Sequence, residues 1–255
     1  MLMSNLFYHL TDSQWKKIEF FFPTRKRRGR PPLNPRIVFN AILWLLKSGA
    51  RWRDLPTCFG NWNSVYHKFR QWIRVGLFEK ILRVLNFATN KYLLVQIDST
   101  FCKVHKHGLG AFKRNGKQAI GKSRGGYTTK IHALVNEYFQ LMGVILTGGQ
   151  IHDSEPALEL FEGIELTGKK VLADKAFGSE KIRDYLAGHG AIVCIPDKSN
   201  AVIKHDFDAQ LYKQRNVVER FFQRIKEFRH IAIRFDKLDI CFLNFIFLAA
   251  FIRHL

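Results

Sequence analysis

The chain has 255 residues, of which 47% are hydrophobic, so it can bury a sizeable core. It carries 41 Lys and Arg against 21 Asp and Glu, and the net charge of +20 fits a polyanionic partner, either nucleic acid or an anionic membrane surface. No apolar run reaches the roughly 18 residues of a membrane span, and the start of the chain lacks a secretory signal pattern, so we expect no membrane association. The four cysteines form no CxxC pair, which favours reduced thiols, no zinc site and a cytoplasmic location.

The first part of the chain has helical patterns interrupted by a basic linker. We expect a helix from Thr11, whose hydroxyl forms a capping box with Gln14. The linker follows at residues 24–34, and its Arg28 and Arg30 resemble an arm that enters a narrow A·T-rich minor groove. A solvated basic linker is an equally supported interpretation.

Three more helices are predicted before residue 90. Asn34 caps one that ends near Gly49, Asn61 caps the next, and the last runs from about Leu77 to Ala88. The helix after Asn61 has an aromatic inner face and leaves a set of side chains pointing outward: His67, Lys68, Arg70, Gln71 and Arg74. The pattern predicts a small all-α, helix-turn-helix-like DNA-binding domain over residues 1–90, with a structural helical cap on the next domain as the alternative.

Strands begin after Tyr92. Leu93–Ile97 is predicted to be a strand that delivers Asp98 at its C-terminal end, and Lys103–Gly126 to be a mobile basic loop. We interpret Asp153 as a helix cap, with a fourth acidic ligand as the alternative. The other expected strands are Thr128–Val135, Gln140–Thr147, Lys170–Ala173 and Ala191–Ile195, and the expected helices are Asp153–Glu162, Glu180–Ala187, Tyr212–Phe228 and Lys237–Ile252. This order predicts an α/β fold with a mixed five-stranded sheet over residues 91–255.

The predicted helix Tyr212–Phe228 has two different faces. At about 100° per residue, one narrow stripe collects Tyr212, Arg215, Glu219, Gln223 and Lys226. The opposite side is apolar and consists of Val217, Val218, Phe221, Ile225 and Phe228. The helix therefore anchors one face in a core and presents a carboxylate flanked by two cations. A solvated face with ordinary i,i+4 charge pairs is the alternative interpretation.

Three carboxylates from separate parts of the chain can converge. Asp98 and Asp174 each follow a predicted strand, and Glu219 lies on the helix after the last strand. Sites in open α/β sheets form beyond the carboxyl ends of the strands, although a strand-terminal Asp alone is more often a cap or turn former. Carboxylate oxygens suit Mg²⁺ or Mn²⁺, and two such ions about 3.5–4 Å apart can activate a water or a 3′-hydroxyl. The residues alone predict a metal-dependent nucleic-acid enzyme.

Several short motifs carry a further signal. They are Tyr212, Arg215, Glu219 and Lys226 at their fixed spacing, Asp174-Lys175-Ala176-Phe177, Gln96-Ile97-Asp98-Ser99-Thr100, GKSRGGYTTKIHALV, GGQIHDS, LTDSQW and WRDLP. Together they resemble the DDE transposases of bacterial insertion sequences, of the IS4/IS5-like group. The resemblance covers nearly the whole chain, and the combination of motifs is specific although each one is weak alone.

This resemblance implies an RNase H-like catalytic domain in which Asp98, Asp174 and Glu219 bind Mg²⁺ or Mn²⁺ and carry out catalysis. It also implies a bacterial, nucleoid-associated protein that acts as a homodimer on double-stranded DNA, both terminal inverted repeats and target. Tyr212 belongs to the signature, and we expect Arg215 to orient Glu219. The expected DNA contacts are Arg28, Arg30, Lys68, Arg70, Arg74, Lys113, Arg114, Lys122, Arg124 and Lys226. A metal-dependent DNA endonuclease and an inactive DNA-binding repressor derived from a transposase are the alternatives.

Overall fold

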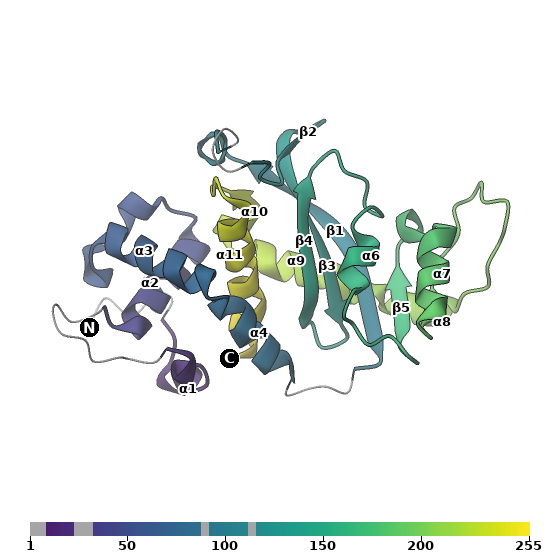
Figure 1. Ribbon diagram of the computed structural model, residues 1–255, viewed down its shortest axis with the longest axis horizontal. Coiled ribbons are helices and arrows are strands. Elements are labelled where there is room, and N and C mark those ends of the chain that lie inside the picture. The colour runs from purple at the N-terminus through teal and green to yellow at the C-terminus, as the bar shows by residue number, and fades with distance from the viewer. Residues whose placement is uncertain (1–8, 23–32, 88–91, 112–115) are drawn as a thin grey trace.

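A mixed β-sheet forms the centre of the molecule in the computed structural model, which describes residues 9–22, 33–87, 92–111 and 116–255 (Figure 1). The strands are β1 (Leu94–Val104), β2 (Gly121–Ser123), β3 (Gly126–Asn136), β4 (Leu141–Gly148), β5 (Lys170–Ala173), β6 (Ile192–Cys194) and β7 (Ile233–Arg234). The main strands lie in the order β4-β3-β1-β5-β6, in which β3 is antiparallel to both neighbours whereas β1, β5 and β6 are parallel. The predicted RNase H-like mixed α/β sheet is confirmed. The short strands β2 and β7 extend it beyond the five strands expected.

The helices of the described residues begin largely where the sequence predicts them. They are α1 (Asp12–Lys16), α2 (Pro35–Ser48), α3 (Trp62–Arg74), α4 (Leu77–Phe87), α6 (Ala157–Phe161), α7 (Glu180–Gly188), α8 (Ala209–Tyr212), α9 (Asn216–Lys226), α10 (Arg229–Ala232) and α11 (Asp239–Phe251). The capping box of Thr11 and the caps at Asn34 and Asn61 are confirmed. α1 ends at Lys16, because Ile18 leaves the helical region (φ −126°) and buries its side chain. No helix in this described part of the chain has the length and apolarity that crossing a membrane requires.

β1 is longer than predicted, so Asp98 lies in the middle of a strand and not at its end. The pairing of β1 with β3 extends from Val95↔Asn136 to Lys103↔Thr128. After Asp98 only Cys102 of the described strand is buried, and Ser99, Thr100 and Lys103 are polar, which concealed the strand in the sequence. The expected loop Lys103–Gly126 is likewise partly strand, since it contains the end of β1 and all of β2.

A hydrophobic core lies on each face of the sheet. On one face, Cys102 and Ile131 pack with α9, α10, α11 and the N-terminal helices. On the other face, Val95 and Ile97 pack with α6 and α7. Figure 1 shows α11 between the N-terminal helices and the sheet, and α11 contacts both. The predicted domains at residues 1–90 and 91–255 thus share one core, and their predicted boundary falls at residues 88–91, outside the described residues.

The segment Tyr212–Phe228 is not the single helix that the sequence predicts. A 3₁₀ turn at Lys213–Arg215 separates α8 from α9. In a continuous helix, the Val218 N–H would donate to the Gln214 carbonyl; here the side-chain amide of Gln96 bonds both groups instead. The predicted apolar face of the segment is buried, as expected.

Phe245 of α11 provides a test of the shared core. This ring is fully buried, and its centroid lies 4.9 Å from that of Phe69 and 6.4 Å from that of Trp52. Phe245→Ala should therefore lower the free energy of unfolding by about 3–5 kcal/mol. All five tryptophans lie between Trp15 and Trp72, so their fluorescence reports the N-terminal helices, whereas far-UV circular dichroism reports the whole chain.

We expect both signals to shift together to lower denaturant concentration in the Phe245→Ala variant, as in a single cooperative transition. Two separated transitions, with the fluorescence midpoint unchanged, would show that the N-terminal helices unfold independently of α11.

Candidate active site

Two neighbouring parallel strands bring Asp98 and Asp174 to the same region of the sheet. Ile97 of β1 is paired with Ala173 of β5, so the two aspartates occupy the next matching positions on strands about 4.8 Å apart. Backbone N–H groups orient both carboxylates: Ser99 N–H donates to Asp98 Oδ1 at 2.8 Å, and Lys175 N–H donates to Asp174 Oδ1 at 2.6 Å. The structure therefore places two of the three predicted carboxylates next to each other.

Arg215 links the third carboxylate to the first. Its Nη1 donates to Asp98 Oδ2 at 3.1 Å, and its Nη2 donates to Glu219 Oε1 at 2.5 Å. Burial raises the pKa of Asp98, and the Ser99 N–H and the guanidinium only partly offset that rise. Burial also opposes the charge on Arg215, yet the nearby Asp98, Tyr212, Glu219 and Asp174 raise its pKa above the usual value. The guanidinium is thus held in place by a group of acidic side chains.

Side chains at alternate positions of β1 contact the segment from residue 212 to 226. Gln96 bonds its backbone, Asp98 bonds Arg215, and the hydroxyl of Thr100 accepts from Lys226 Nζ at 2.5 Å. The Lys226 ammonium also donates to the Phe101 carbonyl at 2.9 Å. Burial lowers the pKa of Lys226, which is half-buried against the sheet. In the protein alone, therefore, the ammonium is bonded to β1.

Tyr212 lies beside the same group. The guanidinium of Arg215 is 5.9 Å from the centroid of its ring, and the ring packs edge-on against Phe207 at 5.7 Å. Burial raises the pKa of the Tyr212 hydroxyl, with a further contribution from the charges of Asp174 and Asp98. All four residues of the predicted C-terminal signature are therefore found on the side of the sheet that carries Asp98.

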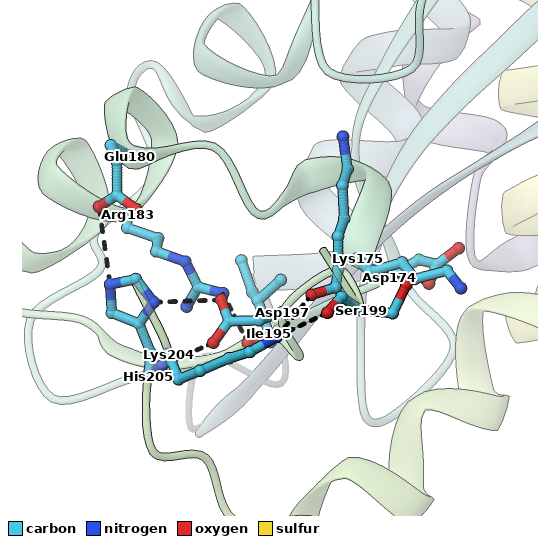
Figure 2. Close-up of polar contacts among 10 residues, drawn as sticks. Asp174, Lys175, Glu180, Arg183, Ile195, Asp197, Ser199, Lys204 and His205 are labelled. Carbon is cyan, nitrogen blue, oxygen red and sulfur yellow. Dashed lines mark hydrogen bonds and ion pairs between the residues drawn. The ribbon is translucent and has the colours of Figure 1, made fainter. Parts of the chain in front are cut away.

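The connection from β6 to α8 is held near this region by a buried ion pair. Arg183 Nη2 donates to Asp197 Oδ1 at 2.7 Å and to the Ile195 carbonyl at 2.9 Å. The His205 N–H donates to Asp197 Oδ2 at 2.5 Å, and Figure 2 shows Arg183, Asp197 and His205 pointing toward one another, with Glu180 beyond the histidine. The sequence analysis did not identify this cluster, which fixes the path of the chain between β6 and the segment that carries Glu219.

Comparisons with known proteins match both halves of the chain. A model described as a putative transposase of the IS4/5 family matches residues 10–82, and a transposase DDE domain model matches residues 89–210. A putative transposase for insertion sequence element IS6501 from Brucella ovis is 32% identical over 126 residues, which cover 48% of this chain and 94% of that protein. An uncharacterized protein, y4sN, from Sinorhizobium fredii is 38% identical over 109 residues, or 42% of this chain and 86% of that protein.

This chain belongs to the DDE transposases of the IS4/IS5 type. Among solved structures, a Mos1 transposase paired-end complex with left transposon end is 13% identical and covers 89% of this chain and 82% of that chain. The TM-score of this match is 0.29. The match to the DDE domain contains Asp98 and Asp174 and ends at residue 210, before Glu219.

The transposase has carboxylate donors whose chemistry suits a hard divalent cation, because Mg²⁺ and Mn²⁺ prefer oxygen ligands. Within the described ranges, however, no three His, Cys, Asp or Glu side chains stand close enough together to hold a metal ion. Arg215 provides the positive charge between Asp98 and Glu219 instead. The carboxylates of Asp98 and Asp174 therefore have the chemistry to bind a divalent metal. The Glu219 carboxylate accepts a hydrogen bond from the Arg215 guanidinium.

Asp153 does not cap a helix, so that prediction was wrong. α6 begins at Ala157, with Pro156 at the N-cap position. The Asp153 carboxylate instead accepts from the Ser99 hydroxyl at 2.5 Å and pairs with the buried Lys130 at 2.9 Å. Because Ser99 follows Asp98 directly in β1, its side chain points to the opposite face of the sheet. Asp153 is thus bonded behind the strand that carries Asp98.

The predicted DNA contacts are in different environments. On α3, Arg74 is exposed and Lys68 is partly exposed, whereas Arg70 donates to Cys241 Sγ of α11 at 2.9 Å, so its predicted outward orientation is wrong. The cause is the packing of α11 against α3. Lys122 of β2 and Arg124 in the turn between β2 and β3 are exposed. The remaining predicted cations, Arg28, Arg30, Lys113 and Arg114, lie outside the described residues.

His132 of β3 is a buried titratable residue that the sequence analysis missed. Its Nε2 is 2.8 Å from the Thr147 hydroxyl, and its Nδ1 has no hydrogen-bond partner among the described residues. Burial lowers the pKa of His132 to about 4. A histidine directly before the apolar run Ala133–Val135 of a predicted strand is the signal that could have identified it.

The pKa of His132 predicts a loss of stability in acid. An unfolded histidine has a pKa of about 6.5, so below that pH the unfolded chain binds a proton that the folded chain excludes until about pH 4. The free energy of unfolding of the wild type should fall by about 1–2 kcal/mol more than that of His132→Gln between pH 7.5 and pH 5. Denaturant titrations of both proteins measure this difference, and parallel pH profiles would contradict a buried neutral imidazole.

Proposed function

We propose that this transposase binds the terminal inverted repeats of an insertion sequence, cuts the DNA there, and joins the cut ends to a target. The observation that supports this proposal best is the arrangement of Asp98 and Asp174 on matching positions of β1 and β5, with Glu219 linked to Asp98 through Arg215. These carboxylates lie in a protein of net charge +20, which favours a polyanionic substrate such as double-stranded DNA.

In this proposal Asp98 and Asp174 hold Mg²⁺ or Mn²⁺, and Glu219 joins them once it is released from Arg215. When bound, a pair of such ions would supply an activated water or 3′-hydroxyl and stabilise the leaving oxygen of the phosphodiester. Arg215 keeps Glu219 oriented before loading, and afterwards its guanidinium is available to a phosphate oxygen. Lys226, bonded to β1 in the protein alone, is placed to exchange the Thr100 hydroxyl for a DNA phosphate.

Recognition of the terminal repeats is assigned to residues 1–90. The exposed Arg74 and the partly exposed Lys68 of α3 support this assignment, and Arg28 and Arg30 remain proposed contacts in the basic linker. We further propose that two copies act together on DNA in the bacterial nucleoid, because two element ends must be cut and joined as a pair. Lys122 and Arg124, with Lys113 and Arg114, are proposed to retain the cut end.

Two alternatives use the same fold. A metal-dependent endonuclease would cut DNA and release it, and a repressor would bind DNA without cutting. The presence of all three carboxylates disfavours the repressor, and the net charge of +20, with Arg215 and Lys226 bonded to β1, disfavours rapid release of a cut end.

A strand-transfer assay tests the proposal directly. Purified protein is mixed with DNA ends that carry a free 3′-hydroxyl, a target plasmid, and Mg²⁺ or Mn²⁺. We expect joined products at staggered target positions from the wild type, and none from Asp174→Asn or Glu219→Gln. Glu227→Gln is the matched control, because Glu227 lies at the end of the same helix but pairs with Arg253, away from Asp98.

Ends with a 3′-dideoxy nucleotide should give no joined product, since the attacking hydroxyl is missing. A second substrate is intact terminal DNA that has not been cleaved beforehand. Cleavage of this DNA without any joining to the target would favour the endonuclease. Normal joining by Asp174→Asn would remove Asp174 from the site, and tight binding of terminal DNA with neither reaction would favour the repressor.

A further inference from the structure

Gln96 is a fully buried polar residue on β1, two positions before Asp98. Its side-chain Nε2 donates to the Gln214 carbonyl at 2.8 Å, and its Oε1 accepts from the Val218 N–H at 3.0 Å. These two backbone groups would bond each other in a continuous α-helix. The side-chain amide of Gln96 therefore replaces one backbone hydrogen bond of that helix, because it lies between the two groups and bonds each of them.

This replacement coincides with the change in helix geometry. Residues Lys213–Arg215 form a 3₁₀ turn between α8 and α9. A 3₁₀ helix turns by about 120° per residue and an α-helix by about 100°, so three residues rotate α9 by about 60° relative to a continuous helix. The direction in which Glu219 points thus depends on whether this turn is kept.

The residues that Gln96 bonds are the immediate neighbours of the two charged groups in the site. Gln214 precedes Arg215, and Val218 precedes Glu219. Arg215, at the N-cap position of α9, makes no capping hydrogen bond with its side chain in the described structure, so the amide on β1 provides a partner for one of the first-turn N–H groups. At the other end of α9, Lys226 bonds Thr100 of the same strand.

We propose that Gln96 is a positioning residue of this active site. By bonding the Gln214 carbonyl and the Val218 N–H, Gln96 prevents these two groups from bonding each other. The 3₁₀ turn is then kept, and Arg215 and Glu219 point toward Asp98. Removal of the amide lets the Gln214 carbonyl and the Val218 N–H bond each other, which closes the turn and rotates Glu219 away. The inference rests on the proposed function, because it assigns Glu219 to the same site as Asp98.

A purely structural role for a buried amide is the competing interpretation, and Asn136 provides a matched control for it. Asn136 is also fully buried, and its side-chain oxygen accepts from the N–H groups of Tyr138 and Gln140 at 3.0 and 3.1 Å. These contacts lie in the turn between β3 and β4. Asn136→Leu therefore removes a buried amide that, in the described structure, makes no hydrogen bond to Gln214, Val218 or any other residue of the segment that carries Glu219.

The test compares Gln96→Met, which has nearly the same shape but lacks both hydrogen-bonding groups, with Asn136→Leu and wild type. Three quantities are measured for each full-length protein: Mn²⁺ affinity by electron paramagnetic resonance without DNA, affinity for terminal DNA, and the single-turnover rate of cleavage. Gln96→Met should weaken Mn²⁺ binding about 10-fold and slow cleavage at least about 100-fold, with terminal DNA bound as tightly as by wild type. Asn136→Leu should change none of these three quantities, even if its melting temperature falls as much as that of Gln96→Met.

If Gln96→Met does not fold, Gln96→Asn replaces it. The asparagine keeps the amide but is one methylene shorter, so it can bond only one of the two backbone groups, and we expect a smaller loss of Mn²⁺ affinity and rate in a folded protein. If the wild type is active and either folded Gln96 variant has the same Mn²⁺ affinity and the same cleavage rate, this inference is overturned and the proposed function is not. A wild type that neither binds Mn²⁺ nor cuts DNA would overturn the proposed function and this inference with it.

Discussion

The side chains of β1 alternate between the two faces of the sheet, and this alternation determines which polar groups can meet. Gln96, Asp98 and Thr100 face the segment that carries Arg215, Glu219 and Lys226, and each of the three makes a hydrogen bond to it. The residues between them face the second core or, at Ser99, the buried pair of Asp153 and Lys130. One face of β1 therefore carries the residues of the candidate site. On the other face, Ser99 is hydrogen-bonded to Asp153.

Charge balance explains how these acidic groups are accommodated close together in the folded protein. Asp98 is mostly buried, and bringing its carboxylate out of water has a cost that the raised pKa reflects. Arg215 offsets part of that cost by pairing with both Asp98 and Glu219. A guanidinium, which has several donors in a plane, can satisfy two carboxylates at once, and it can also transfer to a phosphate. The same residue thus suits both the pairing with the carboxylates and the contact with DNA that we propose.

Much of the fold followed from the sequence, because capping residues, helix periodicity and short apolar strands are local signals. β5, α7 and the caps at Thr11, Asn34 and Asn61 lie where these signals placed them. The errors concern contacts between distant parts of the chain. The length of β1 depends on its pairing with β3, the break before α9 depends on Gln96, and the orientation of Arg70 depends on α11. The residue types of the site were predictable, whereas the bridging by Arg215 and the bonding of Asp153 required the fold.

The central claim is that Asp98, Asp174 and Glu219 form one metal-binding site. Crystals of the protein grown without metal and then soaked in Mn²⁺ test it most directly, because anomalous scattering locates manganese independently of any assay. The account predicts an anomalous peak bonded to Asp98 and Asp174, with Glu219 no longer paired with Arg215, and no such peak in crystals of Asp174→Asn. Manganese bound only at other residues, or an Arg215 bridge that persists at saturating Mn²⁺ with no peak beside it, would contradict the account.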